Sequence, residues 1–202
     1  MRILGIDPGS RFTGWGLLQR EGNRTRYLCS GTLRLRREDS LPERLVQLSD
    51  GIEALLAEHR PDQCALEQIF TAKNARSALV LGHARGVIVC AVARQGLPVH
   101  EYTPAQVKQA VVGVGRASKE QMQQMVALLL GLRAGEAGPE PSRRGRGLQE
   151  DEADALAVAL THAAAARGLA AQGGAGAGRG LPRGGATRRS AAATAGRWRR
   201  LP

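Results

Sequence analysis

Four acidic side chains occupy positions where acids are uncommon. Asp7 ends the apolar run Arg2–Asp7, and Glu67 is the one acid within ALEQIF. Asp151 and Asp154 are three residues apart at the start of a predicted helix, so both project from one face. Charged groups are rarely buried in strands without a partner, and no basic residue stands beside Asp7 or Glu67 in the sequence. These four acids are the candidates for chemistry.

Taken singly, most of these acids have an ordinary structural explanation. Asp7 before Pro8-Gly9 is typical of a turn, and acids in a first helical turn complement the helix dipole. If the four converge at one end of a sheet, each close pair costs about 4 kcal/mol at an effective dielectric of about 20. A divalent cation removes that cost, and oxygen ligands without His or Cys favour Mg²⁺ or Mn²⁺. Two such ions are a standard device for phosphodiester cleavage.

Strands and helices in alternation must bring the acids together. Strands are predicted at Arg2–Asp7, Thr13–Gln19, Arg26–Leu35, Gln63–Phe70 and Leu97–Tyr102. Helices are predicted after Ser40, over Asn74–Gln95, after Thr103, after Ser118 and over Asp151–Ala166, from apolar spacing and N-cap residues. This order predicts an α/β fold, a mixed central β-sheet flanked by helices on both faces.

Composition divides the chain into one domain and a tail. Residues 1–166 are predicted to form the domain, with a flexible loop over 133–149 that is rich in Gly, Pro and Arg. Residues 167–202 hold eight arginines, no acid and no periodic apolar set, which predicts disorder. The formal net charge is +11, but residues 1–166 hold 21 basic and 18 acidic residues. Overall basicity alone is therefore a poor reason to assign a nucleic-acid partner.

The expected location is the cytoplasm. No run of 18 apolar residues predicts a membrane span, and Asp7 comes too early for a secretory segment. Cys29, Cys64 and Cys90 are odd in number and lack a C-x-x-C pair. That spacing favours structural thiols over disulfides or a zinc site.

Four ordered blocks of the sequence carry a resemblance to a known family. They are GIDPGSRFTGWG, ALEQIFTAKNARSALVLGHARG, VKQAVVGVGRASKEQMQQMV and DEADALAVALTH. Across Arg2–Leu132 and Asp151–His162 the chain resembles RuvC, the bacterial Holliday-junction resolvases. The resemblance implies an RNase H-like fold and a homodimer that nicks two opposed strands of four-way junction DNA symmetrically, leaving 5′-phosphate and 3′-hydroxyl ends. It also implies cooperation with the RuvA–RuvB branch-migration complex.

The resemblance gives roles to individual positions. The family's four acidic positions, which imply two Mg²⁺ ions per active site with Mn²⁺ as a substitute, fall on Asp7, Glu67, Asp151 and Asp154. Phe70 matches an aromatic that contacts bases near the crossover, and Lys108 and Lys119 match basic residues that line the DNA and phosphate site. Weaker candidates for backbone contacts are Arg76, Arg85 and Arg116.

Ordinary alternatives exist for these positions too. Phe70 is also a plausible strand-end core residue, and the lysines could lie on a solvated helix face. The chain has only two Phe and three Lys, which favours base stacking by Phe70 and phosphate contacts by Lys108 and Lys119. Nothing in the local pattern of His162 makes it a ligand.

Two further features bear on assembly and on the metal site. The helix predicted over Asn74–Gln95 is apolar almost all round, which predicts one face against the sheet and another against a partner subunit. The loop 133–149 and the tail 167–202 are longer than the family pattern, and the loop is more basic. Because Glu150 and Glu152 flank Asp151, the sequence leaves open which acids at the start of this helix are the metal ligands.

Three other functions compete with junction resolution. The Asp-Pro-Gly turn also resembles the phosphate loop of actin-like sugar kinases, but 202 residues leave no room for their second domain. An RNase H-like nuclease acting on RNA or on another branched DNA would use the same metal chemistry. A non-catalytic junction-binding protein is disfavoured by the intact set of four acids.

Overall fold

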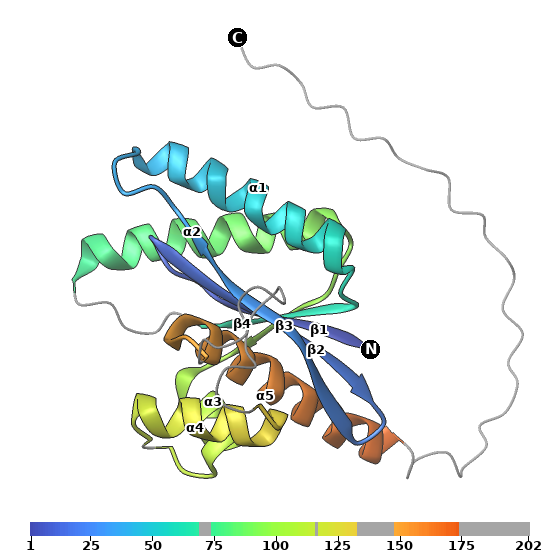
Figure 1. The fold of residues 1–202 in the computed structure, drawn as a ribbon. Coiled ribbons are helices and arrows are strands. Elements are labelled where there is room, and N and C mark those ends of the chain that lie inside the picture. Colours follow the sequence, from blue (N-terminus) through green and yellow to red (C-terminus); the bar gives the residue numbers. More distant parts are fainter. Residues whose placement is uncertain (69–73, 116, 133–147, 174–202) are drawn as a thin grey trace, which may run out of the picture.

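The computed structural model describes residues 1–68, 74–115, 117–132 and 148–173, with only the backbone described over 167–173 (Figure 1). The strands are β1 (Arg2–Asp7), β2 (Phe12–Glu21), β3 (Arg24–Arg34), β4 (Gln63–Glu67) and β5 (Val99–Tyr102). The helices are α1 (Leu41–His59), α2 (Ala75–Arg94), α3 (Pro104–Val112), α4 (Lys119–Leu130) and α5 (Glu150–Gly173). Most elements lie within a few residues of their predicted places.

The five strands form one mixed sheet in the order β3-β2-β1-β4-β5. β1, β2 and β3 pair antiparallel, whereas β1, β4 and β5 run parallel. Ile6 pairs with Leu66 in the register of β1 and β4, so Asp7 and Glu67 end neighbouring strands at the same edge of the sheet. The predicted α/β class with a mixed central sheet is confirmed.

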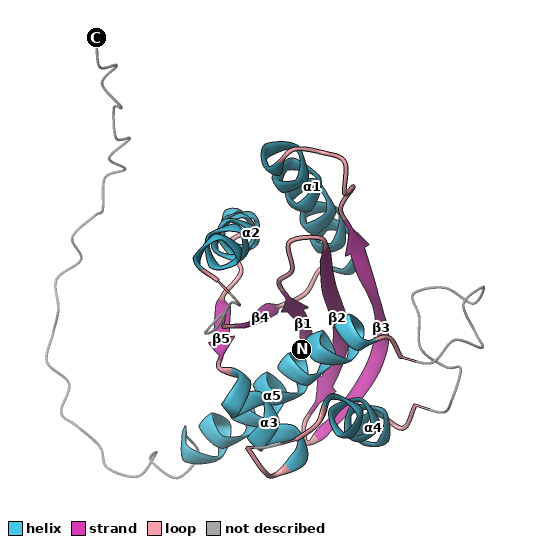
Figure 2. Ribbon diagram, turned by 90° about the vertical axis from the view of Figure 1, so that its left-hand side faces the viewer, coloured by secondary structure: helices cyan, strands magenta, loops and turns pink. Residues whose placement is uncertain are grey.

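The helices cover the sheet in two layers. α1 and α2 pack on one face over a core that includes Leu4, Ile6 and Leu66. α3, α4 and α5 pack on the other face over a core that includes Ile3 and Ala65, and Figure 2 shows the sheet between these two layers. Because side chains alternate along a strand, Asp7 and Glu67 share the face that carries α5.

Polar caps fix where several helices begin. The Ser40 amide donates to the Glu43 carboxylate at 2.7 Å before α1. Thr103 exchanges side-chain and backbone hydrogen bonds with Gln106 before α3, and Ser118 does the same with Gln121 before α4. These reciprocal pairs satisfy amides that have no partner within the helix, and they set the starts of the helices that carry Lys108 and Lys119.

Some predicted boundaries are wrong. β4 ends at Glu67 rather than Phe70, and Ile69 and Phe70 lie outside the described residues. The last helix begins at Glu150 and continues to Gly173, whereas the sequence predicted a helix over Asp151–Ala166. Alanine has the highest helix propensity, so the alanine-rich segment continues the helix without an apolar stripe. The rest of the predicted tail and residues 133–147 of the predicted loop lie outside the described residues.

Helix α2 is long and apolar enough to cross a membrane, judged by length and composition alone. The sequence shows no uninterrupted apolar run here, because polar residues such as Ser77 and His83 interrupt the helix. One such helix is weak support for a membrane span, since core helices of globular proteins pass the same test. Ala84, Ile88, Ala91 and Val92 of α2 are buried in the core shared with α1.

Candidate active site

A tight turn presents Asp7 at the edge of the sheet. The Thr13 hydroxyl donates to the Gly9 carbonyl oxygen at 3.1 Å and lies 3.3 Å from the Gly9 amide, which donates to it. Thr13 is fully buried, so these contacts hold the turn from its inner side. The chain thus reverses directly after Asp7 and leaves the carboxylate at the end of β1.

Glycines in β1 and β2 let α5 approach the sheet closely. A Cβ atom at Gly5 would lie 2.1 Å from the carbonyl oxygen of Ala155, and one at Gly14 would lie 1.9 Å from that of Asp151. Real Cβ atoms essentially never come so near to another atom, so only glycine is compatible with this packing. Gly14 also pairs with Asp7 in the sheet. The start of α5 is therefore seated on the strand beside Asp7.

Asp7, Glu67 and Asp154 each have a raised pKa, with burial as the largest cause. Burial and the nearby Glu67, Asp154 and Asp151 carboxylates raise the pKa of Asp7 well above its usual range. Burial, followed by the charge of Asp154, raises the pKa of Glu67 to about 7, although Lys108 and Lys119 oppose the shift. Burial and Asp151 also raise the pKa of Asp154 against the same two lysines. The charges of Glu67, Asp154 and Asp151 therefore all act on Asp7 at this end of the sheet.

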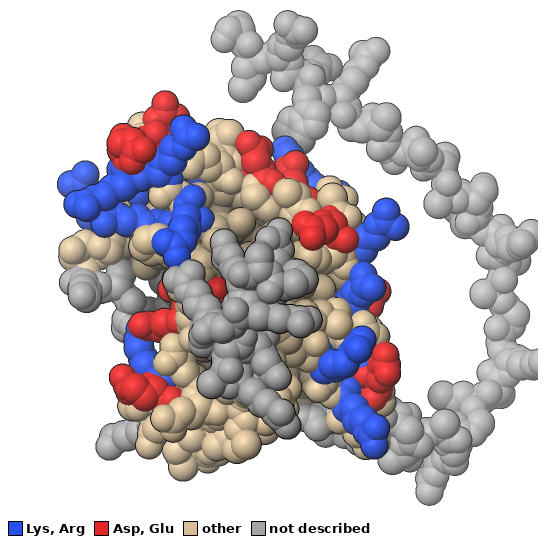
Figure 3. Space-filling view, in the orientation of Figure 1, with Lys and Arg blue, Asp and Glu red and all other residues tan. Residues whose placement is uncertain are grey.

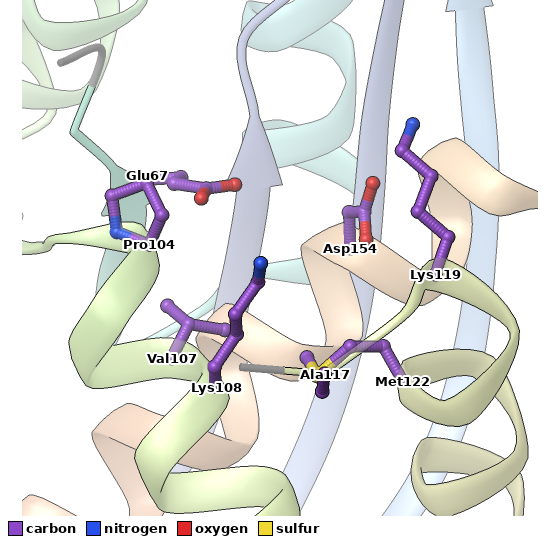
Figure 4. Close-up of a pocket in the computed structure, with 8 residues that line it drawn as sticks. All are labelled: Glu67, Pro104, Val107, Lys108, Ala117, Lys119, Met122 and Asp154. Atoms are coloured by element: carbon purple, nitrogen blue, oxygen red, sulfur yellow. The ribbon is translucent and has the colours of Figure 1, made fainter. Parts of the chain in front are cut away.

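Two lysines face the acids across a cavity of about 220 Å³. Its lining includes Glu67, Asp154, Lys108 and Lys119, and Figure 4 shows the Lys108 ammonium reaching into the space between the two carboxylates. Lys119 also forms an ion pair with Glu150. Glu67 has no basic neighbour along the chain, and its counter-charges Lys108 and Lys119 come instead from α3 and α4.

The donor set suits a hard divalent cation, although the side chains do not form a closed cage. Within the described part of the chain, no three His, Cys, Asp or Glu side chains are close enough to hold an ion. The carboxylates at the end of β1 and β4 and at the start of α5 supply only oxygen, the ligand that Mg²⁺ and Mn²⁺ prefer. The raised pKa values of Asp7, Glu67 and Asp154 show that positive charge would stabilise the ionised forms of these three.

The two other acids at the start of α5 point to different partners. Glu152 is buried and accepts a hydrogen bond from the Ser30 hydroxyl of β3 at 3.1 Å. Glu150 is exposed and pairs with Lys119. Neither lines the cavity between Glu67 and Asp154. Asp151 does not line this cavity either, but its charge and that of Asp154 both raise the pKa of Asp7, so Asp151 and Asp154 are the favoured pair in the register that the sequence left open.

The remaining predicted DNA contacts are not gathered at this cavity. Phe70 and Arg116 lie outside the described residues. Arg76 is exposed in the first turn of α2 and lines a separate groove beside the turn that follows Asp7. Arg85 is engaged in an ion pair with Glu101 at 2.5 Å.

Comparisons with known proteins identify the family. The family model described as crossover junction endodeoxyribonuclease RuvC matches residues 3–162. The chain belongs to the RuvC family. The matched segment spans all four acids, and members of the RuvC family are generally metal-dependent nucleases.

RuvC proteins of several bacteria are similar over most of their length. The crossover junction endodeoxyribonuclease RuvC of Halorhodospira halophila is 52% identical, over 80% of this chain and 89% of the relative. That of Citrifermentans bemidjiense is 50% identical, over 81% of this chain and 92% of the relative. The structure of Thermus thermophilus RuvC in complex with Holliday junction substrate is 35% identical and covers 84% of this chain and 96% of that chain, with a TM-score of 0.71.

The yeast mitochondrial Holliday junction resolvase Ydc2 shares the fold. It is 16% identical, covers 84% of this chain and 83% of that chain, and has a TM-score of 0.58. Together with the RuvC structures, these neighbours confirm the RNase H-like fold class.

Sequence reasoning missed the part that His162 plays in the structure. Its Nδ1 atom lies 2.7 Å from the Tyr102 hydroxyl, and its Nε2 atom lies 2.5 Å from the Gln63 side-chain oxygen. The ring also stacks on His100 at a centroid distance of 4.2 Å. His162 therefore ties α5 to the strands β4 and β5. The eight-residue spacing from Asp154, which places both on one helix face, was the available signal.

We predict that His162 makes stability fall at low pH. Burial and the neighbouring His100 lower the pKa of His162 to about 4, whereas an unfolded histidine has a pKa of about 6.5. The unfolded state therefore takes up a proton first, and stability is complete above pH 6.5 and lost as the pH falls toward 4. Relative to His162→Gln, the unsubstituted chain should lose about 1–2 kcal/mol more between pH 7 and pH 4.5 in urea unfolding.

Glu67 also titrates between pH 4.5 and 7, but its contribution to stability rises as the pH falls. Because both proteins contain Glu67, the difference between them reports the contribution of His162 alone. Equal losses of stability in His162→Gln and in the unsubstituted chain would contradict the assignment of a neutral, buried His162.

Proposed function

We propose that this chain resolves Holliday junctions by hydrolysing phosphodiester bonds at the acidic site, with nicks placed symmetrically in two opposed strands. The observation that carries the proposal is the mutual repulsion of Asp7, Glu67 and Asp154 at the end of β1. The RuvC family model spans these acids, and the similar Thermus thermophilus RuvC is known in complex with Holliday junction substrate. Homologous recombination and DNA repair are the processes that need such a reaction.

The proposed metal ligands are Asp7, Glu67, Asp151 and Asp154, holding two Mg²⁺ ions with Mn²⁺ as a substitute. Bound divalent ions would lower the pKa of water and neutralise charge on the phosphate. Because the acids are not yet close enough to form a cage, we expect their side chains to draw together on binding. Glu67, whose pKa is about 7, must lose a proton to bind, so metal affinity should fall below neutral pH.

Basic and aromatic residues are proposed to hold the DNA around these acids. Lys108 and Lys119 face the cavity and would attract the phosphate that the acids alone would repel. Arg76 would contact the backbone from the start of α2. Phe70 and Arg116 stay proposals from the resemblance, for base stacking and for backbone contact respectively.

We also propose that the chain acts as a homodimer, because two opposed strands need two sites. The outer side of α2 carries the exposed residues Leu79, Gly82 and Gly86 at helical spacing, and Leu79 is 66% exposed. An exposed apolar stripe of this kind is typical of a protein interface. The RuvA–RuvB complex as a partner, the cytoplasm as the location and the domain limits at 166 and 167 remain proposals as well.

Leu79→Glu should convert the dimer into a monomer. A glutamate at the centre of an apolar interface would bury an unpaired charge, which costs several kcal/mol, whereas on the free monomer the same side chain stays in water. At micromolar concentration, sedimentation velocity should show Leu79→Glu at half the mass of the unsubstituted chain. The Leu79→Glu monomer should still unfold in one cooperative thermal transition. Val46→Glu, at a 59% exposed position on α1, is the matched control and should stay dimeric. An unchanged mass for Leu79→Glu would refute this interface.

The proposed activity is tested by comparing substrates and metal. A synthetic four-way junction and a linear duplex of the same sequence are incubated with Mg²⁺ or with EDTA. We expect cleavage of the junction with Mg²⁺ only. Equal cleavage of the duplex would favour a general nuclease, and equal cleavage in EDTA would exclude the metal site.

A further inference from the structure

An arginine-lined groove lies on the opposite layer of the molecule from Lys108 and Lys119. Its lining includes Ser10, Arg11, Arg44, Arg76 and Ser77, and it encloses about 260 Å³. It is formed by the turn after β1, by α1 and by the first turns of α2. Figure 3 shows Lys and Arg side chains gathered on the side of the molecule where α1 and α2 begin.

The groove is positively charged without internal compensation. Its lining holds three arginines and no acid, and none of the three forms an ion pair within the part of the chain that the structure describes. The nearby acid Glu43 instead accepts hydrogen bonds from Ser40. The N-terminal end of α2, where Asn74 caps the Ser77 amide at 2.9 Å, adds the positive end of a helix dipole. Positive charges held together in this way favour the binding of an anion.

Arg44 is held in place with one donor left over. Its Nη1 atom donates to the Ser10 carbonyl oxygen at 3.0 Å. Its Nε atom is buried and has no hydrogen-bond partner among the described residues. A buried donor without a partner costs about 1–3 kcal/mol, which an acceptor entering the groove would recover.

The groove is close to the proposed site of cleavage. Ser10 follows Asp7 by three residues, and three residues span at most about 11 Å. Successive phosphates of one strand are separated by about 3.4 Å along a duplex axis. A strand with one phosphate at Asp7 would therefore bring another to the groove within about three nucleotides.

We propose that Arg11, Arg44 and Arg76 bind the sugar-phosphate backbone two or three nucleotides from the cleaved phosphate. This inference rests on the proposed function. The DNA strand then crosses the edge of the sheet, held by Lys108 and Lys119 of the α3–α4 layer on one side and by this arginine groove of the α1–α2 layer on the other. Backbone contacts on both sides of Asp7 fix the register of the strand without reading its sequence.

The test is metal-free binding of a synthetic four-way junction over a range of salt concentrations. The variant is Arg11→Gln/Arg76→Gln, which spares the internal hydrogen bond of Arg44. The control is Arg24→Gln/Arg26→Gln, which removes the same charge from exposed positions at the start of β3, at the sheet end opposite Asp7. Melting temperatures are measured for all proteins, and if the double variant is unfolded, Arg76→Gln alone replaces it.

Two lost phosphate contacts should lower the slope of log K against log salt by about 2 and weaken binding about 10-fold at 0.1 M salt. The control should stay within about twofold, since its arginines touch no phosphate. A neutral methylphosphonate two or three nucleotides from the cut should weaken binding by the unsubstituted chain but not by the variant, because the contact is already lost. Equal losses of junction affinity in the variant and the control would overturn the proposal that the groove binds phosphate. So would an equal loss of affinity on methylphosphonate substitution in the variant and the unsubstituted chain.

Cleavage by the unsubstituted chain with Mg²⁺ is measured in parallel. If that chain binds the junction without cutting it, the proposed activity fails, while the comparison of binding slopes still decides the groove.

Discussion

Asp7→Asn should reduce junction cleavage by about 10³-fold or more, which corresponds to about 4 kcal/mol of transition-state stabilisation. The charges of the other three acids all act on Asp7, so its replacement removes the proposed metal ligand that is coupled by charge to all of them. Junction binding in EDTA should stay within about threefold, because phosphate contacts come from basic side chains. Single-turnover cleavage and an electrophoretic binding assay measure the two quantities separately.

The same substitution should stabilise the metal-free protein. Burial and three neighbouring carboxylates disfavour the charge of Asp7, and asparagine keeps the shape without the charge. We expect the free energy of unfolding in EDTA to rise by about 1–3 kcal/mol, the range found for buried polar groups that lack a partner. Asp50→Asn, at an exposed position on α1, is the matched control and should change neither stability nor cleavage.

A loss of both binding and folding in Asp7→Asn would mean that Asp7 serves the fold rather than the reaction. That result would contradict the assignment of Asp7 as a metal ligand.

Gly14→Ala should displace the start of α5, which carries Asp151 and Asp154, from Asp7 at the end of β1. The added Cβ would lie 1.9 Å from the Asp151 carbonyl oxygen, a backbone atom that can move only with the start of α5. Overpacking of this kind costs about 1–3 kcal/mol. A displacement of about 1 Å at a reacting centre costs about 10²-fold in rate, so cleavage should fall by that factor even where the protein remains folded.

The control for this prediction is Gly51→Ala on α1. Its Cβ would meet the side-chain methyl groups of Leu33 at 3.0 Å and 3.2 Å, which can turn aside. Stability should change by less than about 1 kcal/mol and cleavage should be unchanged. Thermal unfolding and the cleavage rate at saturating Mg²⁺ measure both variants. Full activity in Gly14→Ala would show that the close packing of α5 on β2 does not position Asp151.

Local patterns in the sequence were sufficient to predict most of the fold. The apolar run Arg2–Asp7 placed Asp7 at the end of β1, and the N-cap residues Ser40, Thr103 and Ser118 marked the starts of three helices that the structure contains. The end of α5 was not predictable in this way, because alanine allows a helix to continue where no apolar stripe requires it. The periodicity of apolar residues therefore predicted which segments form packed helices, but it predicted the ends of those helices less well.

The arrangement of the site depended on contacts between distant segments. Gly14 was predicted only as part of the strand Thr13–Gln19, but its backbone lies against Asp151, 137 residues later in the chain. Lys108 and Lys119 were candidates by family resemblance, whereas their placement opposite Glu67 comes from the packing of α3 and α4 on α5. The spacing of His162 from Asp154 could place it on one face of α5 but could not predict its contacts, because its partners Tyr102 and Gln63 belong to two other elements.

The most direct test of the central claim is to map the nicks on a mobile four-way junction labelled in turn on each strand. With Mg²⁺, the account predicts nicks in two opposed strands at symmetric positions, with 5′-phosphate and 3′-hydroxyl ends that ligase seals without further processing. Unpaired nicks at unrelated positions, or ends that ligase cannot seal, would contradict resolution of the junction by the site at Asp7, Glu67, Asp151 and Asp154.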